Sequence, residues 1–237
     1  MTNTNRLAPL EAARMFVQEN FPNYQGALLA GSVVRGEATD TSDLDIVIFD
    51  ESKPSSYRQS LIDFGWPIEV FVHNLTSYQT FFESDYKRAR PSLQRMVSEG
   101  LVLQDKGIID KIKKEANTIL EKGPEKWSSQ TIETKRYFIT DTLGDFIGSN
   151  NRAEELLIIS TLANHLHEFI LRTNGRWIGS SKWIIRELNQ FNRDLTERYV
   201  DALETYYTTN DKKKIIEFTD EVLKPYGGRL FDGFTIG

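Results

Sequence analysis

Two short apolar segments joined by a polar loop, within residues 28–49, constrain the fold more than any other stretch. The second segment opens with two aspartates, Asp43 and Asp45. Side chains at i and i+2 of a strand share a face, so both carboxylates should point one way while Leu44 and Ile46 point into a core. Neighbouring carboxylates repel each other unless a cation lies between them. The pair therefore predicts either a cation site or a solvent-facing turn at the start of the strand.

The strand pattern is confined to the first part of the chain. A loosely alternating segment, a Gly-Trp-Pro turn and the strand 68–73 together suggest a hairpin. After Lys106 the apolar spacing is helical. We expect an α+β protein, with a small mixed β-sheet and flanking helices in residues 1–105 and an all-α helical bundle in residues 106–237. The expected helices are 9–20, 77–88, 91–99, 106–121, 130–147, 152–173, 181–191, 194–208 and 211–223.

The composition narrows the class of protein. The formal net charge is -5, whereas proteins that bind long nucleic acids usually carry a basic face, so we expect a small substrate and no long nucleic acid. No stretch approaches the roughly 20 apolar residues of a membrane span. The sequence has no cysteine, which excludes disulfides, and its first residues lack the apolar core of a signal peptide. We expect a cytoplasmic protein without a membrane partner.

Two further features lie near the aspartates. Glu69 occupies the polar side of the apolar strand 68–73, where burying a lone acid costs several kcal/mol unless the acid is paired. If this strand lies beside the aspartate strand, three carboxylates converge; otherwise Glu69 faces water on an edge strand. Gly31 and Ser32 end the first apolar segment, where backbone amides and a hydroxyl can hold phosphate oxygens.

The combination of these residues is similar to a known signature. Gly31 and Ser32, a gap of ten residues, Asp43 and Asp45 around a leucine, and Glu69 on a later strand resemble the motif of the nucleotidyltransferase superfamily related to DNA polymerase β. Residue types, spacing and strand context all agree over residues 28 to 72. The small α/β domain followed by helices looks like the aminoglycoside and lincosamide nucleotidyltransferase branch.

The resemblance implies a nucleotidyltransferase fold for the first domain and a reaction that needs magnesium. A nucleoside monophosphate, with AMP from ATP as the expected case, would pass from a nucleoside triphosphate to a hydroxyl of a small acceptor, such as an aminoglycoside-like antibiotic. Pyrophosphate would leave. Two alternatives stay open: AMP transfer onto a protein hydroxyl, as in antitoxin-type relatives, and a non-catalytic nucleotide-binding regulatory protein.

The resemblance also implies roles for individual residues. Asp43, Asp45 and Glu69 would be the catalytic residues and the ligands of one or two Mg²⁺ ions, since hard oxygen ligands suit magnesium. Gly31 and Ser32 would hold the terminal phosphates. Glu69 would either complete the metal site or take the acceptor's proton, and the sequence leaves both roles open.

Two cations are further candidates for binding the nucleotide. Arg35 follows Ser32 closely, so its guanidinium either contacts the triphosphate or is a solvated loop residue. Lys182 is expected in the first turn of a helix capped by a serine, where a cation opposes the helix dipole. A bound anion would resolve that conflict, and we hypothesise that Lys182 reaches the triphosphate; the alternative is an exposed lysine.

The helical half holds other polar and aromatic candidate side chains. Asp141 and Asp145 stand at i and i+4 of one expected helix, where they bind a cationic acceptor, supply a base or form a solvated face. His165 and His167 stand at i and i+2, so they do not share a helix face and no metal is assigned to them. Trp177 and Trp183 are expected in the core, with stacking on a base or sugar ring as the alternative.

Overall fold

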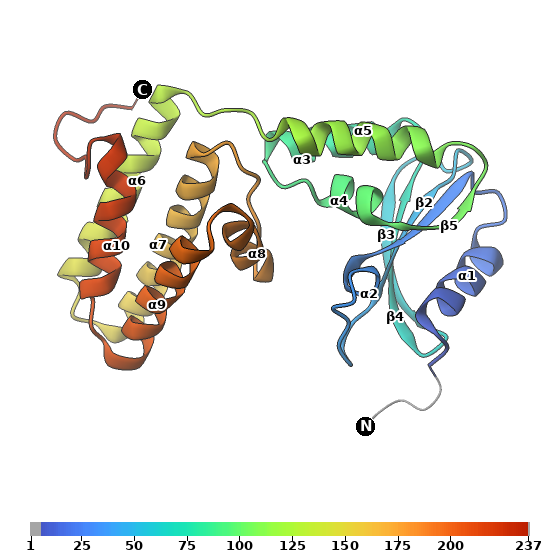
Figure 1. Ribbon diagram of the computed structural model, residues 1–237, viewed down its shortest axis with the longest axis horizontal. Coiled ribbons are helices and arrows are strands. Elements are labelled where there is room, and N and C mark those ends of the chain that lie inside the picture. Colours follow the sequence, from blue (N-terminus) through green and yellow to red (C-terminus); the bar gives the residue numbers. More distant parts are fainter. Residues whose placement is uncertain (1–5, 237) are drawn as a thin grey trace. The chain divides into compact units, whose positions relative to one another are not determined.

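The computed structural model describes residues 6–236 and divides the chain into two compact units, Met1–Lys122 and Gly123–Gly237 (Figure 1). The first unit is a five-stranded mixed sheet with helices, and the second is helical. The expected α+β class is therefore confirmed.

The sheet of the first unit has the strand order β3-β4-β2-β1-β5. The middle strands β2 and β4 run parallel, while β1 pairs antiparallel with both β2 and β5, and β3 pairs antiparallel with β4. Parallel pairing of β2 and β4 places the strand that carries Glu69 beside the strand that carries Asp45. The strands are β1 (Gly26–Ala30), β2 (Leu44–Phe49), β3 (Tyr57–Asp63), β4 (Trp66–His73) and β5 (Leu101–Asp105).

The hairpin that joins β3 to β4 has a two-residue turn. Phe64 and Gly65 both have positive φ, 49° and 76°, and Asp63 pairs with Trp66 across the turn. Two residues in the left-handed region match the right-handed twist of the flanking strands. The hairpin expected from the sequence is present, and it makes β3 an edge strand.

Helices cover both faces of the sheet, because each strand alternates two sets of apolar side chains. Helix α1 (Pro9–Asn20) packs Phe16 and Val17 against Leu29 and Ile46 on one face. On the other face, buried strand residues pack against helices α3 (Ser77–Lys87), α4 (Ser92–Glu99) and α5 (Ile109–Lys122). The strand residues of this second cluster are Leu28, Val47 and Phe49, and its helix residues include Tyr78, Phe82, Leu93, Val97, Ile109 and Ile112.

Helix α5 belongs to the first unit. Ile109 and Ala116 are fully buried and Ile112 is 2% exposed, and all three belong to the cluster on the sheet. The division between the units therefore falls after Lys122, whereas the sequence pattern led us to place it between residues 105 and 106. The strand pattern ends at β5, but the first unit also includes α5, because this helix packs on the sheet.

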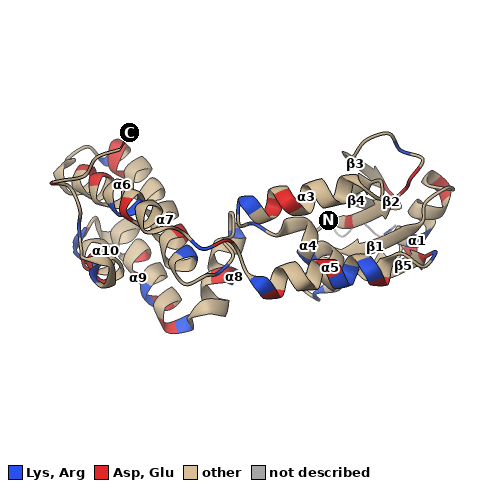
Figure 2. Ribbon diagram, turned by 90° about the horizontal axis from the view of Figure 1, so that it is seen from above, with Lys and Arg blue, Asp and Glu red and all other residues tan. Residues whose placement is uncertain are grey.

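The second unit contains helices α6 (Ser129–Gly148), α7 (Arg152–Thr173), α8 (Lys182–Phe191), α9 (Arg193–Thr209), α10 (Lys213–Leu223) and the short 3-10 helix η1 (Lys224–Tyr226). Side-chain oxygens of Ser128, Asn151 and Asn192 accept hydrogen bonds from backbone amides at the starts of α6, α7 and α9. These caps satisfy amides that have no partner inside the helix. In the view of Figure 2, acidic and basic residues are interspersed along the helices.

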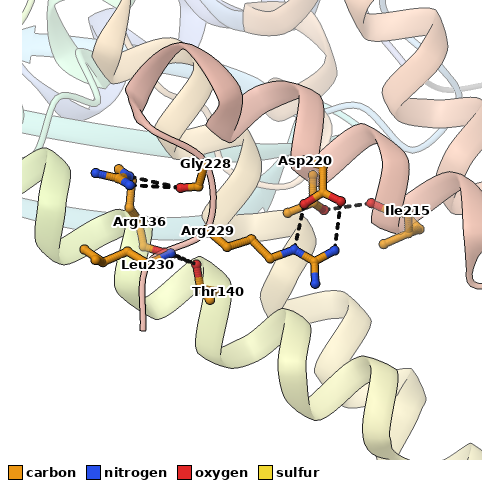
Figure 3. Close-up of polar contacts among 8 residues, drawn as sticks. Arg136, Thr140, Ile215, Asp220, Gly228, Arg229 and Leu230 are labelled. Atoms are coloured by element: carbon orange, nitrogen blue, oxygen red, sulfur yellow. Dashed lines mark hydrogen bonds and ion pairs between the residues drawn. The ribbon is translucent and has the colours of Figure 1, made fainter. Parts of the chain in front are cut away.

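The segment after η1 is fastened to α6 and α10 (Figure 3). Arg136 donates two hydrogen bonds to the carbonyl of Gly228, and the amide of Leu230 donates to the hydroxyl of Thr140 at 2.9 Å. Arg229 forms a two-pronged ion pair with Asp220. Within the described residues, no helix combines the length and the apolar character that a membrane crossing requires.

Candidate metal and nucleotide site

The three acidic residues singled out in the sequence come together on one face of the sheet. Asp43 directly precedes β2, Asp45 is its second residue, and Asp45 pairs in register with Glu69 of the parallel strand β4. Residues paired in register share a face, so the two carboxylates point the same way. One carboxylate oxygen from each of Asp43, Asp45 and Glu69 lies within 4.8 Å of the other two.

The surroundings of Asp45 explain why this end of the face stays accessible. Asp45, Val47 and Phe49 are every second residue of β2, so they lie on the same face, which α3, α4 and α5 cover. Val47 and Phe49 are fully buried under these helices, but Asp45 keeps intermediate exposure. The face thus changes from an apolar core to a half-buried acidic cluster within three residues.

The electrostatics of the cluster favour a bound cation. Burial, and after it the negative charges of Asp43 and Glu69, raise the pKa of Asp45 to about 6, against the opposing charges of Arg35 and Arg58. A carboxyl that is reluctant to ionise among like charges gains most from a positive ion beside it. Three carboxylates at this spacing supply the hard oxygen ligands that Mg²⁺ prefers, so the residues present fit a divalent cation.

The backbone of Gly31 is fitted closely against this cluster. Gly31 has a φ of +79°, and a Cβ added to it would lie 1.9 Å from the Oδ2 atom of Asp45. Any side chain would therefore collide with the carboxylate and strain the backbone. Gly31 begins the short helix α2 (Gly31–Val34) directly after β1, whose last residue pairs with Asp45. The predicted glycine thus lies against the predicted acid.

Hydroxyl groups accompany the glycine. Ser32 is 9% exposed, and its Oγ donates to the Oγ of Ser42 at 3.2 Å. The same Ser42 oxygen accepts from the backbone amide of Thr39 at 2.8 Å. Ser42 immediately precedes Asp43, so the loop that links Ser32 to the acids is tied together by hydroxyls. From the sequence this segment was expected only to be a polar loop, and Ser42 was not among the candidate residues.

Arg35 is an ion-paired residue of this region. Its guanidinium pairs with Glu37 at 3.1 Å and with Glu99 at the end of α4. Its side chain is 20% exposed, and its positive charge lowers the pKa of Asp45. The solvated loop arginine considered from the sequence does not describe this environment, and contact with a triphosphate stays a prediction.

Arg58 on the edge strand β3 is a second residue of the site that the sequence pattern did not predict. It donates from Nη2 to Oε2 of Glu69, and its guanidinium lies 5.0 Å from the ring centroid of Phe71. The signal was weak, because a lone arginine in a polar, loosely alternating segment has no spacing that ties it to Glu69 eleven residues later. The register of the hairpin creates the contact.

The remaining candidates lie in the second unit. Lys182 is the first residue of α8 and is exposed. A serine, Ser181, occupies the N-cap position as expected, with a φ of 51°, but it makes no side-chain capping hydrogen bond. Asp141 and Asp145 are exposed on α6. A role for these three side chains in binding the triphosphate or the acceptor stays a prediction.

The histidines and tryptophans of the second unit are largely enclosed. His167 is 2% exposed and Trp177 is 7% exposed. Trp183 has intermediate exposure, and Arg186 lies over its ring at 4.8 Å. For Trp177 the expected place in the core is confirmed.

Comparison with solved structures gives a similarity over most of the chain. The nucleotidyltransferase-like protein from Exiguobacterium sibiricum 255-15 aligns with a TM-score of 0.49 and 13% sequence identity, covering 92% of this chain and 75% of that one. Among the curated proteins, none matches the chain.

Comparison with family models gives a match to the part of the chain that contains the three acids. Residues 10–89 match the family model described as a nucleotidyltransferase domain. This range contains β1, β2 and β4 and hence Gly31, Asp43, Asp45 and Glu69. The match agrees with the resemblance found in the strand, glycine-serine and acidic motif. The domain that carries the three carboxylates therefore belongs to the nucleotidyltransferase superfamily.

Proposed function

We propose that the protein is a magnesium-dependent nucleotidyltransferase that moves a nucleoside monophosphate, AMP in the first instance, from a nucleoside triphosphate to a hydroxyl of a small acceptor. The observation that carries the proposal is the convergence of Asp43, Asp45 and Glu69, with ligand oxygens within 4.8 Å of one another in a nucleotidyltransferase domain. A cluster of three half-buried acids is unfavourable without a cation, which supports a function that uses one.

The three acids would hold one or two Mg²⁺ ions. When bound, magnesium neutralises charge on the triphosphate and on the departing pyrophosphate. Asp43 and Asp45 offer oxygens from the start of one strand, and Glu69 offers its oxygen from the neighbouring strand. Because these strands belong to the packed sheet, the three ligands are held by a rigid part of the domain, as a metal site requires.

The phosphate chain would lie on the β1 side of the acids. Gly31 brings its backbone against Asp45, and the Ser32 hydroxyl is within hydrogen-bond distance of Ser42. Backbone amides and hydroxyls in such a turn can donate to phosphate oxygens. Arg35, held by Glu37 and Glu99, would add positive charge on this side, and Lys182 of the second unit is proposed as a further contact.

The acceptor hydroxyl has to lose a proton during transfer. Phosphoryl-type transfer places the attacking and leaving oxygens roughly in line, so an acceptor would approach from the side away from the departing pyrophosphate. With the phosphates on the β1 side, Glu69 would lie on the acceptor side, because β4 is next to β2 and away from β1. We therefore favour Glu69 as the carboxylate beside the acceptor, where its oxygen can accept the hydroxyl proton.

Release of pyrophosphate provides the test of this proposed reaction. Purified protein is incubated with labelled ATP, Mg²⁺ and pools of hydroxylated acceptors, including aminoglycosides, and pyrophosphate release is measured. We expect acceptor-dependent release by the wild type, a loss of at least about 100-fold in Asp43→Asn, and little change in Asp110→Asn, whose carboxylate is exposed on α5.

A contrary result is equally well defined. If no acceptor pool supports release and the protein shows no Mg²⁺-dependent binding of ATP, the enzymatic proposal fails and a non-catalytic role is favoured. If protein substrates but no small molecules become labelled, the acceptor is a protein hydroxyl.

A further inference from the structure

Arg58 places a positive charge directly against one of the three acids. It lies on the edge strand β3, which pairs antiparallel with β4. In this register Ser60 faces Glu69 and Arg58 faces Phe71, so Arg58 is the diagonal neighbour of Glu69 on the same face of the sheet. Its Nη2 atom donates to Oε2 of Glu69.

The contact is charge-assisted and accessible to solvent. The side chain of Arg58 is 59% exposed and that of Glu69 is 25% exposed. The guanidinium also lies 5.0 Å from the ring centroid of Phe71, a cation–π contact that helps to hold it beside β4. An ion pair with this exposure is weak enough to be exchanged for a stronger partner.

Arg58 and Arg35 both lower the pKa of Asp45 through their positive charge, but they have different ion-pair partners. Arg35 is paired with Glu37 and Glu99, neither of which belongs to the acidic cluster. Arg58 instead uses an oxygen of Glu69, which is a member of that cluster. A divalent cation entering the cluster would meet both the guanidinium charge and an occupied carboxylate oxygen.

We propose that Arg58 is the resident counter-ion of the metal-free acidic cluster, and that a divalent cation must compete with its guanidinium for Glu69. The inference rests on the proposed function, because it assumes that the cluster binds a metal. Arg58 would then set the metal concentration at which the site fills. It does so by pairing with one ligand and by repelling a second positive charge at short range.

Direct metal binding tests this role without relying on activity. Mn²⁺ binding to the full chain is measured by calorimetry or by the loss of the free-ion electron paramagnetic resonance signal, at low ionic strength and without nucleotide. We expect Arg58→Gln to bind Mn²⁺ roughly 3- to 10-fold more tightly than the wild type, because both the competing pair and the repulsion are removed. Raising the salt concentration should shrink this difference.

Three variants separate the site effect from a general change of charge. Arg58→Lys keeps the positive charge and should stay close to the wild type. Arg14→Gln removes the same charge from an exposed position on α1, whose buried residues pack on the other face of the sheet, and should leave Mn²⁺ binding unchanged. Adding Asp45→Asn to Arg58→Gln should abolish the gain, which assigns it to the acidic cluster.

The outcomes of the two proposals are distinguishable. Equal or weaker Mn²⁺ binding by folded Arg58→Gln, with clear binding by the wild type, overturns the role of Arg58 but leaves the metal site intact. Absence of binding by every variant overturns the metal site and the counter-ion together. Binding by Arg58→Gln but not by the wild type supports Arg58 as the competing cation. Thermal melting of each variant confirms that the compared proteins are folded.

Discussion

Asp45 is constrained both by close packing and by neighbouring negative charges. It lies against the backbone of Gly31 on one side and beside Asp43 and Glu69 on the other. Burial and the neighbouring carboxylates both oppose its ionisation and raise its pKa to about 6. At neutral pH and without a bound cation, ionised Asp45 therefore lowers the free energy of unfolding.

Substituting this residue should therefore stabilise the metal-free protein. The folded state holds the Asp45 proton up to about pH 6, whereas an ordinary unfolded aspartate releases it near 3.8. The stability that this group contributes is full below pH 3.8 and is lost as the pH rises through 6. At pH 8 in EDTA, Asp45→Asn should raise the free energy of unfolding by on the order of 1 to 2 kcal/mol, a value reduced for partial exposure.

Urea denaturation followed by tryptophan fluorescence at a series of pH values measures the effect. The advantage of Asp45→Asn should grow between about pH 4 and 6 and level off above that range. The same change at Asp110, an exposed residue of α5, serves as the control and should have little effect. A destabilised Asp45→Asn variant at pH 8 would contradict the account of repulsion at this site.

At this scale the sequence predicted the acids but not their partners. Asp43, Asp45 and Glu69 were found because strand periodicity and spacing are local properties of the chain. Arg58 and Ser42 were missed because their contacts depend on the hairpin register and on the path of a loop, which local patterns do not fix.

Among the elements, helix α5 shows how far periodicity reaches. Its helical spacing was evident, and the structure has it from Ile109 to Lys122. The sequence did not show to which unit this helix belongs, because the same apolar stripe could pack on a sheet or within a helical bundle. Ile109 and Ile112 belong to the apolar cluster on the sheet, so α5 is part of the first unit.

A buried residue of this helix should be costly to truncate. Ile112 is 2% exposed and belongs to the cluster that includes Val47 and Phe49, so Ile112→Ala should lower the free energy of unfolding by about 2 to 4 kcal/mol. Ile62, which is 81% exposed on β3, provides the matched control, and Ile62→Ala should cost less than about 1 kcal/mol. Equal costs for the two substitutions in chemical denaturation would refute the assignment of α5 to this core.

The strands illustrate a second limit. Helix α1 has the expected bounds 9–20, and β1 covers the first of the two apolar segments recognised in the sequence. Strand β3 has mostly exposed residues and a weak alternation, so it was recognisable only as one arm of a hairpin. Edge strands of this kind are held by the backbone ladder more than by a buried face.

For the whole molecule, the two parts of the chain carry different amounts of functional information. The first unit contains the acidic cluster and matches the nucleotidyltransferase domain over residues 10–89. The second unit was predicted as a run of helices, and the structure has α6 to α10 there. Its candidate residues Lys182, Asp141 and Asp145 stay predictions, because helical periodicity describes packing and not the chemistry of a ligand.

We propose that Asp43, Asp45 and Glu69 together hold a divalent cation, and anomalous X-ray diffraction from crystals of the full chain grown with Mn²⁺ and a non-hydrolysable ATP analogue would locate it. We expect an anomalous peak within about 2.0 to 2.4 Å of oxygens from all three carboxylates, with phosphate oxygens among the other ligands. A bound analogue without an anomalous peak at these carboxylates would refute the metal site.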